Sequence, residues 1–138
     1  MTQNIGKIEI GWDTPEHTVV HMTMHDGWTW EALYQVNPVI IAMMSSTDET
    51  VHLLIDYMHT RTVPMGGVIM HARNILTAYP PNCDLLIIVT RNMLVQRLAS
   101  IFQSTFRGGV GSRVYSVTSY ADADRLIRSR AQSQLNAS

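Results

Sequence analysis

Residues 83–90 read Cys-Asp-Leu-Leu-Ile-Ile-Val-Thr, the most continuous apolar strand pattern in the chain. Residues 51–58 read Val-His-Leu-Leu-Ile-Asp-Tyr-Met and predict a second strand of the same kind. Strands that are apolar without alternation are typical of parallel sheets whose two faces are both covered. We therefore expect these two strands to form the buried centre of a sheet.

Helical patterns separate and follow the strands. Residues 68–79 predict a helix that ends before Pro80-Pro81, and residues 93–106 predict another. A strand is expected over 113–117, and Ser119-Tyr-Ala-Asp122 is a capping box that opens a last helix to about residue 131, before a frayed polar tail. Alternating strands and helices favour parallel pairing through right-handed crossovers.

The first third of the chain differs from this repeat. Residues 7–12 and 17–25 alternate in polarity, and Asp13-Thr-Pro-Glu16 lies between them with turn chemistry, so an antiparallel hairpin is predicted. A helix over 29–44 follows, with Thr29 as its cap. Pro38 is expected to kink or split this helix, because proline removes a backbone donor and clashes with the preceding turn.

The predicted fold class is therefore α/β, in the order ββαβαβαβα. Its mixed five-stranded sheet has an antiparallel first hairpin followed by parallel βα units. The 138 residues form one expected domain, 1–138, with its core at about 6–131. A chain of this size buries roughly 68% of its unfolded surface, enough for a full core.

Charge and composition exclude several classes. Ten basic and eleven acidic residues give a net charge of −1, which offers no support for binding nucleic acid or an anionic membrane. Apolar runs at 39–44 and 85–89 are far shorter than the ~20 residues of a membrane span, and the start lacks the apolar core of a signal peptide. We expect a cytoplasmic protein. Charge is nevertheless uneven: residues 1–69 carry net −6 and residues 70–138 carry net +5.

Four short motifs and the order of elements resemble the SpoIIAA-like superfamily. They are Trp12-Asp13, Pro15-Glu16-His17-Thr18, Trp28-Thr29-Trp30-Glu31 and Leu54-Ile55-Asp56. That superfamily includes STAS domains of anti-sigma-factor antagonists and the lipid-binding lobe of SEC14-type proteins, and this chain looks most similar to an uncharacterised bacterial branch. The resemblance covers roughly residues 6–131 and implies a STAS-like fold and a regulatory binding role.

One departure from the antagonist pattern bears on function. The resemblance implies a phosphorylated serine at a helix start shortly after the strand that ends in Asp56. The matching segment here reads Val63-Pro64-Met65-Gly66-Gly67 and has no hydroxyl group. Because the family's partner switch depends on the charge of that phosphate, we expect no such switch at this position.

Polar groups are expected at the carboxyl ends of the parallel strands, where sheets of this kind bind ligands. The candidate binding residues are His59, Arg61, Met65, Gly66, Gly67 and Arg91. The two arginines suit an acidic group, and the glycines permit close approach. The alternative is that these segments are ordinary solvated loops.

Other candidates for chemistry have simpler interpretations. His17, His21 and His25 lie four residues apart on one strand, roughly 13 Å from one to the next, so we expect solvated or hydrogen-bonded histidines, as for His52 and His71, and no metal site. Cys83 is expected to be buried and inert. The stretch Gly108-Gly109-Val110-Gly111 follows a helix and is interpreted as a helix stop, not a phosphate loop, so no cofactor is expected.

The first functional hypothesis is a non-enzymatic interaction domain that recognises a protein partner or a small ligand at the 64–79 helix face. The second is a carrier of a small apolar or lipid-like molecule, held between the 29–44 helix and the sheet. Seven flexible methionines could provide its adaptable lining: Met22, Met24, Met43, Met44, Met58, Met65 and Met70. The alternative is that these methionines fill the core. An enzyme is third, because no nucleophile and base pair is visible. A homodimer is left open, with no self-complementary patch identified.

Overall fold

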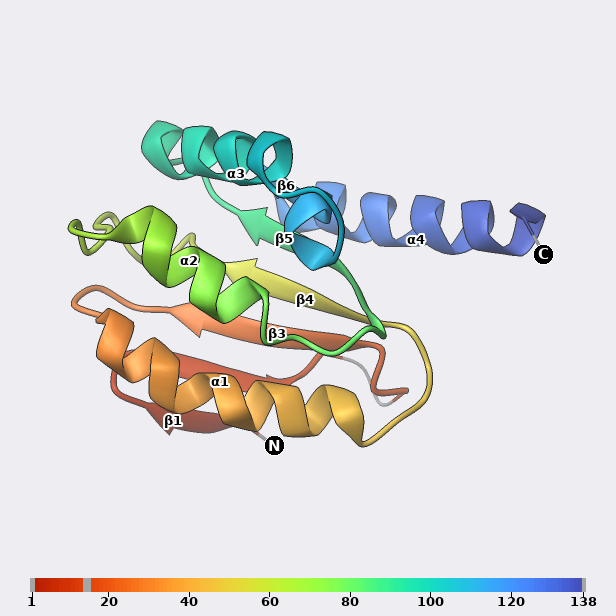
Figure 1. Ribbon diagram of the computed structural model, residues 1–138, viewed down its shortest axis with the longest axis horizontal. Helices are drawn as coiled ribbons and strands as arrows, with labels where there is room; N and C mark the ends of the chain where they lie inside the picture. Colours follow the sequence, from red (N-terminus) through yellow and green to blue (C-terminus); the bar gives the residue numbers. More distant parts are fainter. Residues whose placement is uncertain (1, 14–15, 138) are drawn as a thin grey trace.

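The computed structural model describes residues 2–13 and 16–137 and, within them, one six-stranded sheet with four α-helices (Figure 1). The strands are β1 (Gln3–Ile5), β2 (Ile8–Trp12), β3 (Val19–Met24), β4 (Val51–Asp56), β5 (Cys83–Val89) and β6 (Val114–Val117). The α-helices are α1 (Trp30–Ser45), α2 (Val68–Leu76), α3 (Met93–Thr105) and α4 (Tyr120–Ala137), and a short 3₁₀ helix, η1 (Val110–Arg113), precedes β6.

Strand order in the sheet follows the chain, from β1 at one edge to β6 at the other. β1, β2 and β3 pair antiparallel, and β3 to β6 pair parallel. Since each right-handed crossover steps in the same direction, α1, α2 and α3 all cover one face. The terminal helix α4 packs on the opposite face against β5 and β6 (Figure 1). The predicted α/β class and the hairpin followed by parallel units are confirmed; Thr14 and Pro15 of the predicted turn lie outside the described residues.

The prediction of five strands is wrong, because β1 adds a sixth. Gln3 and Asn4 are exposed, so this three-residue edge strand has no polarity pattern to reveal it. It turns into β2 at Gly6, whose φ of 61° lies in the left-handed region. A Cβ at Gly6 would also come within 2.9 Å of the Ala32 side chain. Both the backbone conformation and this close approach therefore require glycine at the turn.

Pro38 does not split the helix, since α1 runs unbroken from Trp30 to Ser45. Pro38 lies on the exposed side of α1. The predicted cap is confirmed, because Thr29 accepts a hydrogen bond from the Ala32 amide at 3.1 Å.

The last helix is longer than the sequence predicts. Its start is confirmed, because the Ser119 hydroxyl accepts the Asp122 amide at 3.1 Å. It continues to Ala137, past the expected end near 131 and through the tail that was expected to fray. No glycine or proline interrupts residues 120–137, so nothing in the local sequence ends the helix. Its last turns extend beyond the sheet in Figure 1.

The core lies in two layers around the sheet. Every residue of β5 is buried, and β4 is buried except at Ile55, which confirms the prediction for the two central strands. Ile55 is partly exposed although it occupies a central strand under the helices. Its exposure marks a gap in the packing. No helix within the described ranges is long and apolar enough to cross a membrane.

Candidate functional site

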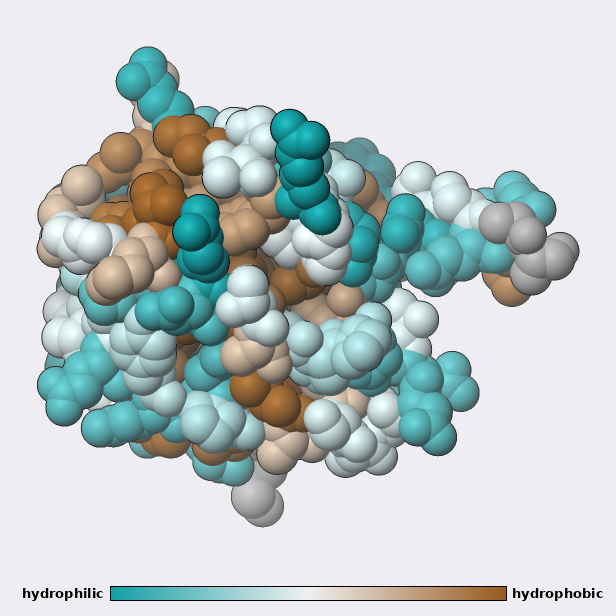
Figure 2. All heavy atoms as spheres, viewed as in Figure 1, coloured by the Kyte–Doolittle hydropathy of each residue, from teal (hydrophilic) through white to brown (hydrophobic). Residues whose placement is uncertain are grey.

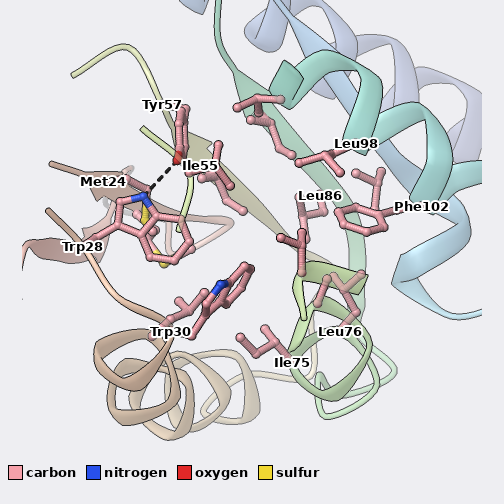
Figure 3. Close-up of a pocket in the computed structure, with 18 of the residues that line it drawn as sticks. Met24, Trp28, Trp30, Ile55, Tyr57, Ile75, Leu76, Leu86, Leu98 and Phe102 are labelled. Atoms are coloured by element: carbon pink, nitrogen blue, oxygen red, sulfur yellow. Dashed lines mark hydrogen bonds between the residues drawn. The ribbon is translucent and has the colours of Figure 1, made fainter. Parts of the chain in front are cut away.

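An apolar cavity of about 110 Å³ lies between the sheet and the helices α1, α2 and α3 (Figure 3). Side chains from three sides of the fold line it. The sheet contributes Met22, Met24, Ile55, Tyr57, Leu86, Ile88 and Val114; the region of α1 contributes Trp28, Trp30 and Leu33; α2 and its flanks contribute Val63, Val68, Ala72, Ile75, Leu76 and Tyr79; and α3 contributes Val95, Leu98 and Phe102. In Figure 3 the labelled side chains lie on opposite sides of this space.

The polar atoms of the aromatic wall are already satisfied. The Trp28 indole N–H donates to the Tyr57 hydroxyl at 2.9 Å, and that hydroxyl donates to the carbonyl of Thr62. The Trp30 indole N–H donates to the carbonyl of Pro64 at 2.9 Å. Burial raises the pKa of Tyr57 to about 12, so its hydroxyl stays protonated near neutral pH. The cavity therefore offers carbon and sulfur surface and no unused donor from these three rings.

The two indoles form a rigid corner. Trp28 and Trp30 meet edge to face, with ring centroids 5.0 Å apart, and Trp28 packs edge to face against Tyr57. Such contacts favour one arrangement of the rings, because the positive edge of one meets the negative face of the other. His71 of α2 stacks on Trp30 from outside and bonds to Tyr34 at 2.7 Å. This stack joins α1 to α2 beside the cavity.

The cavity opens at the edge where β4 ends. Besides Ile55, the partly exposed lining residues include Val63, Val68 and Leu98. These belong to the loop 57–67, to the first turn of α2 and to α3. The opening thus lies between the loop 57–67, the first turn of α2 and the second turn of α3.

The loop 57–67 is anchored on both sides of this opening. Asp26 accepts hydrogen bonds from the Thr60 hydroxyl at 2.7 Å and from the Arg61 amide at 2.9 Å. The hydrogen bond from Thr60, followed by that from the Arg61 backbone, lowers the pKa of Asp26. Asn92, which caps α3, donates to the Arg61 carbonyl at 3.2 Å. One wall of the cavity is therefore tied to both the β3 end and the α3 start.

Five of the six predicted binding residues lie in this region. Met65 is 68% exposed, and Gly66 and Gly67 follow it with φ values of 99° and 68° before α2 begins. Arg61 and Arg91 are exposed, and their guanidinium groups form no salt bridge with any residue that the structure describes. Whether they bind a partner or ligand stays a prediction.

His59 does not join the other five. Its Nε2 lies 3.6 Å from an Asp56 carboxylate oxygen, and its ring packs against His25. Asp56 lies on the sheet face that α4 covers in part, so His59 faces away from the cavity. A residue two or three positions after a strand can turn to either face, which the sequence pattern does not specify.

Sequence reasoning missed a polar network on that second face. His21 lies 3.0 Å from Asp13 through Nδ1 and 3.2 Å from Asp56 through Nε2. The Tyr120 hydroxyl donates to both Asp56 oxygens, at 3.0 and 2.9 Å. Burial and the neighbouring Asp56 carboxylate raise the pKa of Tyr120 to about 12. A groove of about 350 Å³ runs past these groups and is bordered by Leu54, Asp124 and Ile127.

The remaining histidines and the cysteine have structural surroundings. His17 stacks on Trp12, and His52 accepts the Leu85 amide at 3.2 Å where the β4–β5 register shifts. Over the described ranges, no group of three or more His, Cys, Asp and Glu side chains is placed to hold a metal ion. Cys83 is 1% exposed, and burial raises the pKa of its thiol to about 12, in line with the expectation of a buried cysteine.

The methionine prediction is correct only in part. Met22 and Met24 line the cavity, whereas Met43, Met44 and Met58 pack elsewhere in the core. Met65 and Met70 are exposed. The cavity also lies nearer α2 and α3 than the 29–44 helix, which contributes only Trp30 and Leu33. The sequence carries one signal for the cavity. The helical spacing of Val68, Ala72, Ile75 and Leu76 defines the inward face of α2.

Comparison of the chain with protein-family models, with curated proteins and with solved structures found no match. The resemblance to the SpoIIAA-like superfamily therefore stays a prediction.

Proposed function

We propose that this chain is a non-enzymatic binding domain of STAS-like fold that holds a small apolar molecule in the cavity between the sheet and α1, α2 and α3. The cavity itself carries the proposal, because its volume is about 110 Å³ and its aromatic N–H and O–H groups are already bonded. An engineered apolar cavity of about 150 Å³ stays dry and binds benzene. The element order supports the STAS-like fold.

The space is an energetic cost to the empty protein. Protein interiors are packed as densely as organic crystals, so a void of this size forfeits contacts on every wall. At about 24 cal/mol per Å³ of cavity, a volume of about 110 Å³ corresponds to roughly 2 to 3 kcal/mol. A bound apolar molecule would restore those contacts. The cavity is thus suited to a ligand that stabilises the fold.

The walls define the class of ligand. Trp28, Trp30 and Phe102 offer ring surfaces, while Met22 and Met24 offer flexible thioethers that adapt to shape. A charged or strongly hydrogen-bonding group inside would lose its water without a partner in return. The ligand is accordingly a neutral aromatic ring or a short alkyl group. A longer molecule would leave its polar end at the opening between α2 and α3.

A second candidate is recognition of a partner at the predicted residues beside the opening. The observation that favours it is the exposure of Met65 next to two arginines without salt bridges among the described residues. Reversing the charges of Arg61 and Arg91 together should leave the fold intact and remove binding to such a partner. Unchanged binding would count against this surface.

Calorimetric titration with benzene tests the first proposal. The wild-type protein should bind benzene and not benzoate, because the cavity has no group to pair with a carboxylate. Ala72 lines the cavity on α2, so Ala72→Phe should fill the space and abolish binding. Ala131 is exposed on α4, so Ala131→Phe adds the same atoms elsewhere and should bind as the wild type does. Equal binding by the two variants would contradict the proposal.

A further inference from the structure

Exposed apolar side chains gather where α2 and α3 begin. Met93 is 71% exposed, Met65 68% and Met70 57%, and Ile69, Leu94 and Ile101 are exposed as well. Met65 lies in the loop before α2, and Ile69 and Met70 lie in the first turn of α2. Met93 and Leu94 begin α3, and Ile101 lies two turns further along it. In Figure 2 brown surface is concentrated at the upper left, over the side where these two helices begin. We name the surface formed by these six residues the α2–α3 face.

The same stretch of chain is strongly basic. Residues 57–113 contain six arginines and one acidic residue, Asp84. Asp84 is buried and paired with Arg113 and Arg130, so it does not neutralise the surface. The exposed arginines of the stretch are Arg61, Arg73, Arg91, Arg97 and Arg107. Asp26 approaches from the β3 side, where its carboxylate is held by Thr60 and the Arg61 amide. The net charge of −1 conceals this local excess.

We propose that the α2–α3 face binds the surface of an anionic lipid bilayer. Helices that lie in a membrane surface combine an apolar side with basic residues, and their binding depends on both apolar burial and attraction to anionic headgroups. Arginine suits this position because its aliphatic stem lies along apolar surface while the guanidinium reaches the headgroups. Three flexible methionines at the helix starts need no complementary pocket to become buried.

Charge argues against a second copy of the chain as the occupant. A two-fold interface would place the same face on both sides and bring the two sets of arginines together. The face therefore requires a negatively charged partner, and a bilayer supplies negative charge and apolar volume at the same place. The cavity opens beside this face, between α2 and α3. Passage of the apolar ligand between bilayer and cavity rests on the proposed function; binding of the face to lipid does not.

Co-sedimentation with vesicles tests the proposal. The protein should bind vesicles of phosphatidylcholine with about one third phosphatidylserine, and bind pure phosphatidylcholine far more weakly. The double variant Arg91→Glu/Arg97→Glu should weaken binding at least about tenfold, since each arginine contributes to attraction near an anionic surface. Met65→Ser/Met93→Ser should also weaken it, through the apolar contribution alone. High salt should reduce wild-type binding, because it screens exposed charges.

The control reverses two arginines on another element. Arg125 and Arg128 are exposed on α4, outside the α2–α3 face, so Arg125→Glu/Arg128→Glu makes the same change in net charge and should keep vesicle binding. Ala72→Phe should also keep it, which separates this proposal from the one on the cavity. Equal binding to both vesicle types, equal loss in the two arginine double variants, or binding only to an acidic protein would each overturn the proposal.

Discussion

The two faces of the central sheet differ in how the helices cover them. Three helices cover one face, and between them remains an apolar cavity whose polar neighbours bond to the loop 57–67. On the other face α4 packs mainly against β5 and β6, and its first residue, Tyr120, joins the polar network of His21 and Asp56 at the end of β4. The cause is topological: a sheet whose parallel strands follow chain order receives every crossover helix on one side.

The two faces differ in the hydrogen-bond partners of their polar side chains. Beside the cavity the Trp28 N–H donates to the Tyr57 hydroxyl, and the Trp30 N–H and the Tyr57 hydroxyl donate to backbone carbonyls, which leaves the interior apolar. On the α4 face the carboxylate of Asp56 is 4% exposed and is held by Tyr120, His21 and its own backbone neighbour Met58. Asp56 is thus satisfied within the fold, whereas under the proposed function the cavity face is completed by a bound molecule.

The largest effect should come from the ionic contact that holds α4 to the sheet. Asp84 accepts from Arg130 Nε at 2.7 Å and lies 3.1 Å from Arg113 Nε. Asp84→Ala leaves two guanidinium groups without their carboxylate and should lower the free energy of unfolding by about 2 to 3 kcal/mol. Urea denaturation of the wild type and the variant measures this change in the free energy of unfolding. The exposed pair of Asp122 and Arg125 is the control, since Asp122→Ala removes only a solvent-screened contact and should change the free energy of unfolding far less. Equal losses would contradict the assignment.

Two alanine substitutions on the cavity face should act in opposite directions. Ala99 is 1% exposed and does not line the cavity, so Ala99→Leu overpacks the core and should destabilise by about 1 to 3 kcal/mol. Ala72 lines the cavity, so Ala72→Leu fills space and should stabilise by about 0.5 to 2 kcal/mol. Thermal unfolding of both variants checks the signs. Destabilisation by Ala72→Leu comparable to that by Ala99→Leu would show that the space is not available.

Removal of one hydroxyl on each face compares the two ways of satisfying polar groups. Tyr57→Phe leaves the Trp28 N–H unpaired and removes the closer of two donors to the Thr62 carbonyl, and Tyr120→Phe removes the donor to both oxygens of Asp56. Each should destabilise by about 1 to 2 kcal/mol. The readout that separates them is benzene binding, which Tyr57→Phe should alter and Tyr120→Phe should not. An effect of Tyr120→Phe on benzene affinity would couple the faces and contradict their independence.

The smallest effect concerns pH and lies on the α4 face. Burial lowers the pKa of His52 below its ordinary value of 6.5, and the ring accepts the Leu85 amide. The unfolded chain therefore takes up the proton first, so stability present above about pH 6.5 should decline as the pH falls toward 5. Urea denaturation at pH 7 and pH 5 measures the change, and His52→Asn should reduce it. The same decline in both proteins would assign it to other histidines.

Much of the fold could be predicted from local pattern. The apolar runs at β4 and β5, and the hydroxyl caps at Thr29 and Ser119, are signals within a few residues of one another. β1 escaped prediction because an exposed three-residue edge strand carries no alternation. Pro38 does not split α1, and only tertiary packing decides that its side of the helix is exposed.

The candidate site was harder to predict for physical reasons. A cavity is space that three helices fail to fill, so no single residue marks it. Its walls come from side chains as distant as Met22 and Val114. The bond between Tyr120 and Asp56 likewise joins residues 64 positions apart. The predicted edge of the sheet was informative because the topology places every parallel strand end there, although the direction of His59 was not specified.

The central claim is that the cavity on the helical face holds an apolar molecule. Native mass spectrometry of the protein purified from its own cells tests it most directly, with Ala72→Phe and Ala131→Phe prepared in the same way. We predict one additional small mass on the wild-type protein and on Ala131→Phe, released as an apolar compound on denaturation, and none on Ala72→Phe. The bare chain mass in all three preparations, or the same added mass in all three, would contradict the claim.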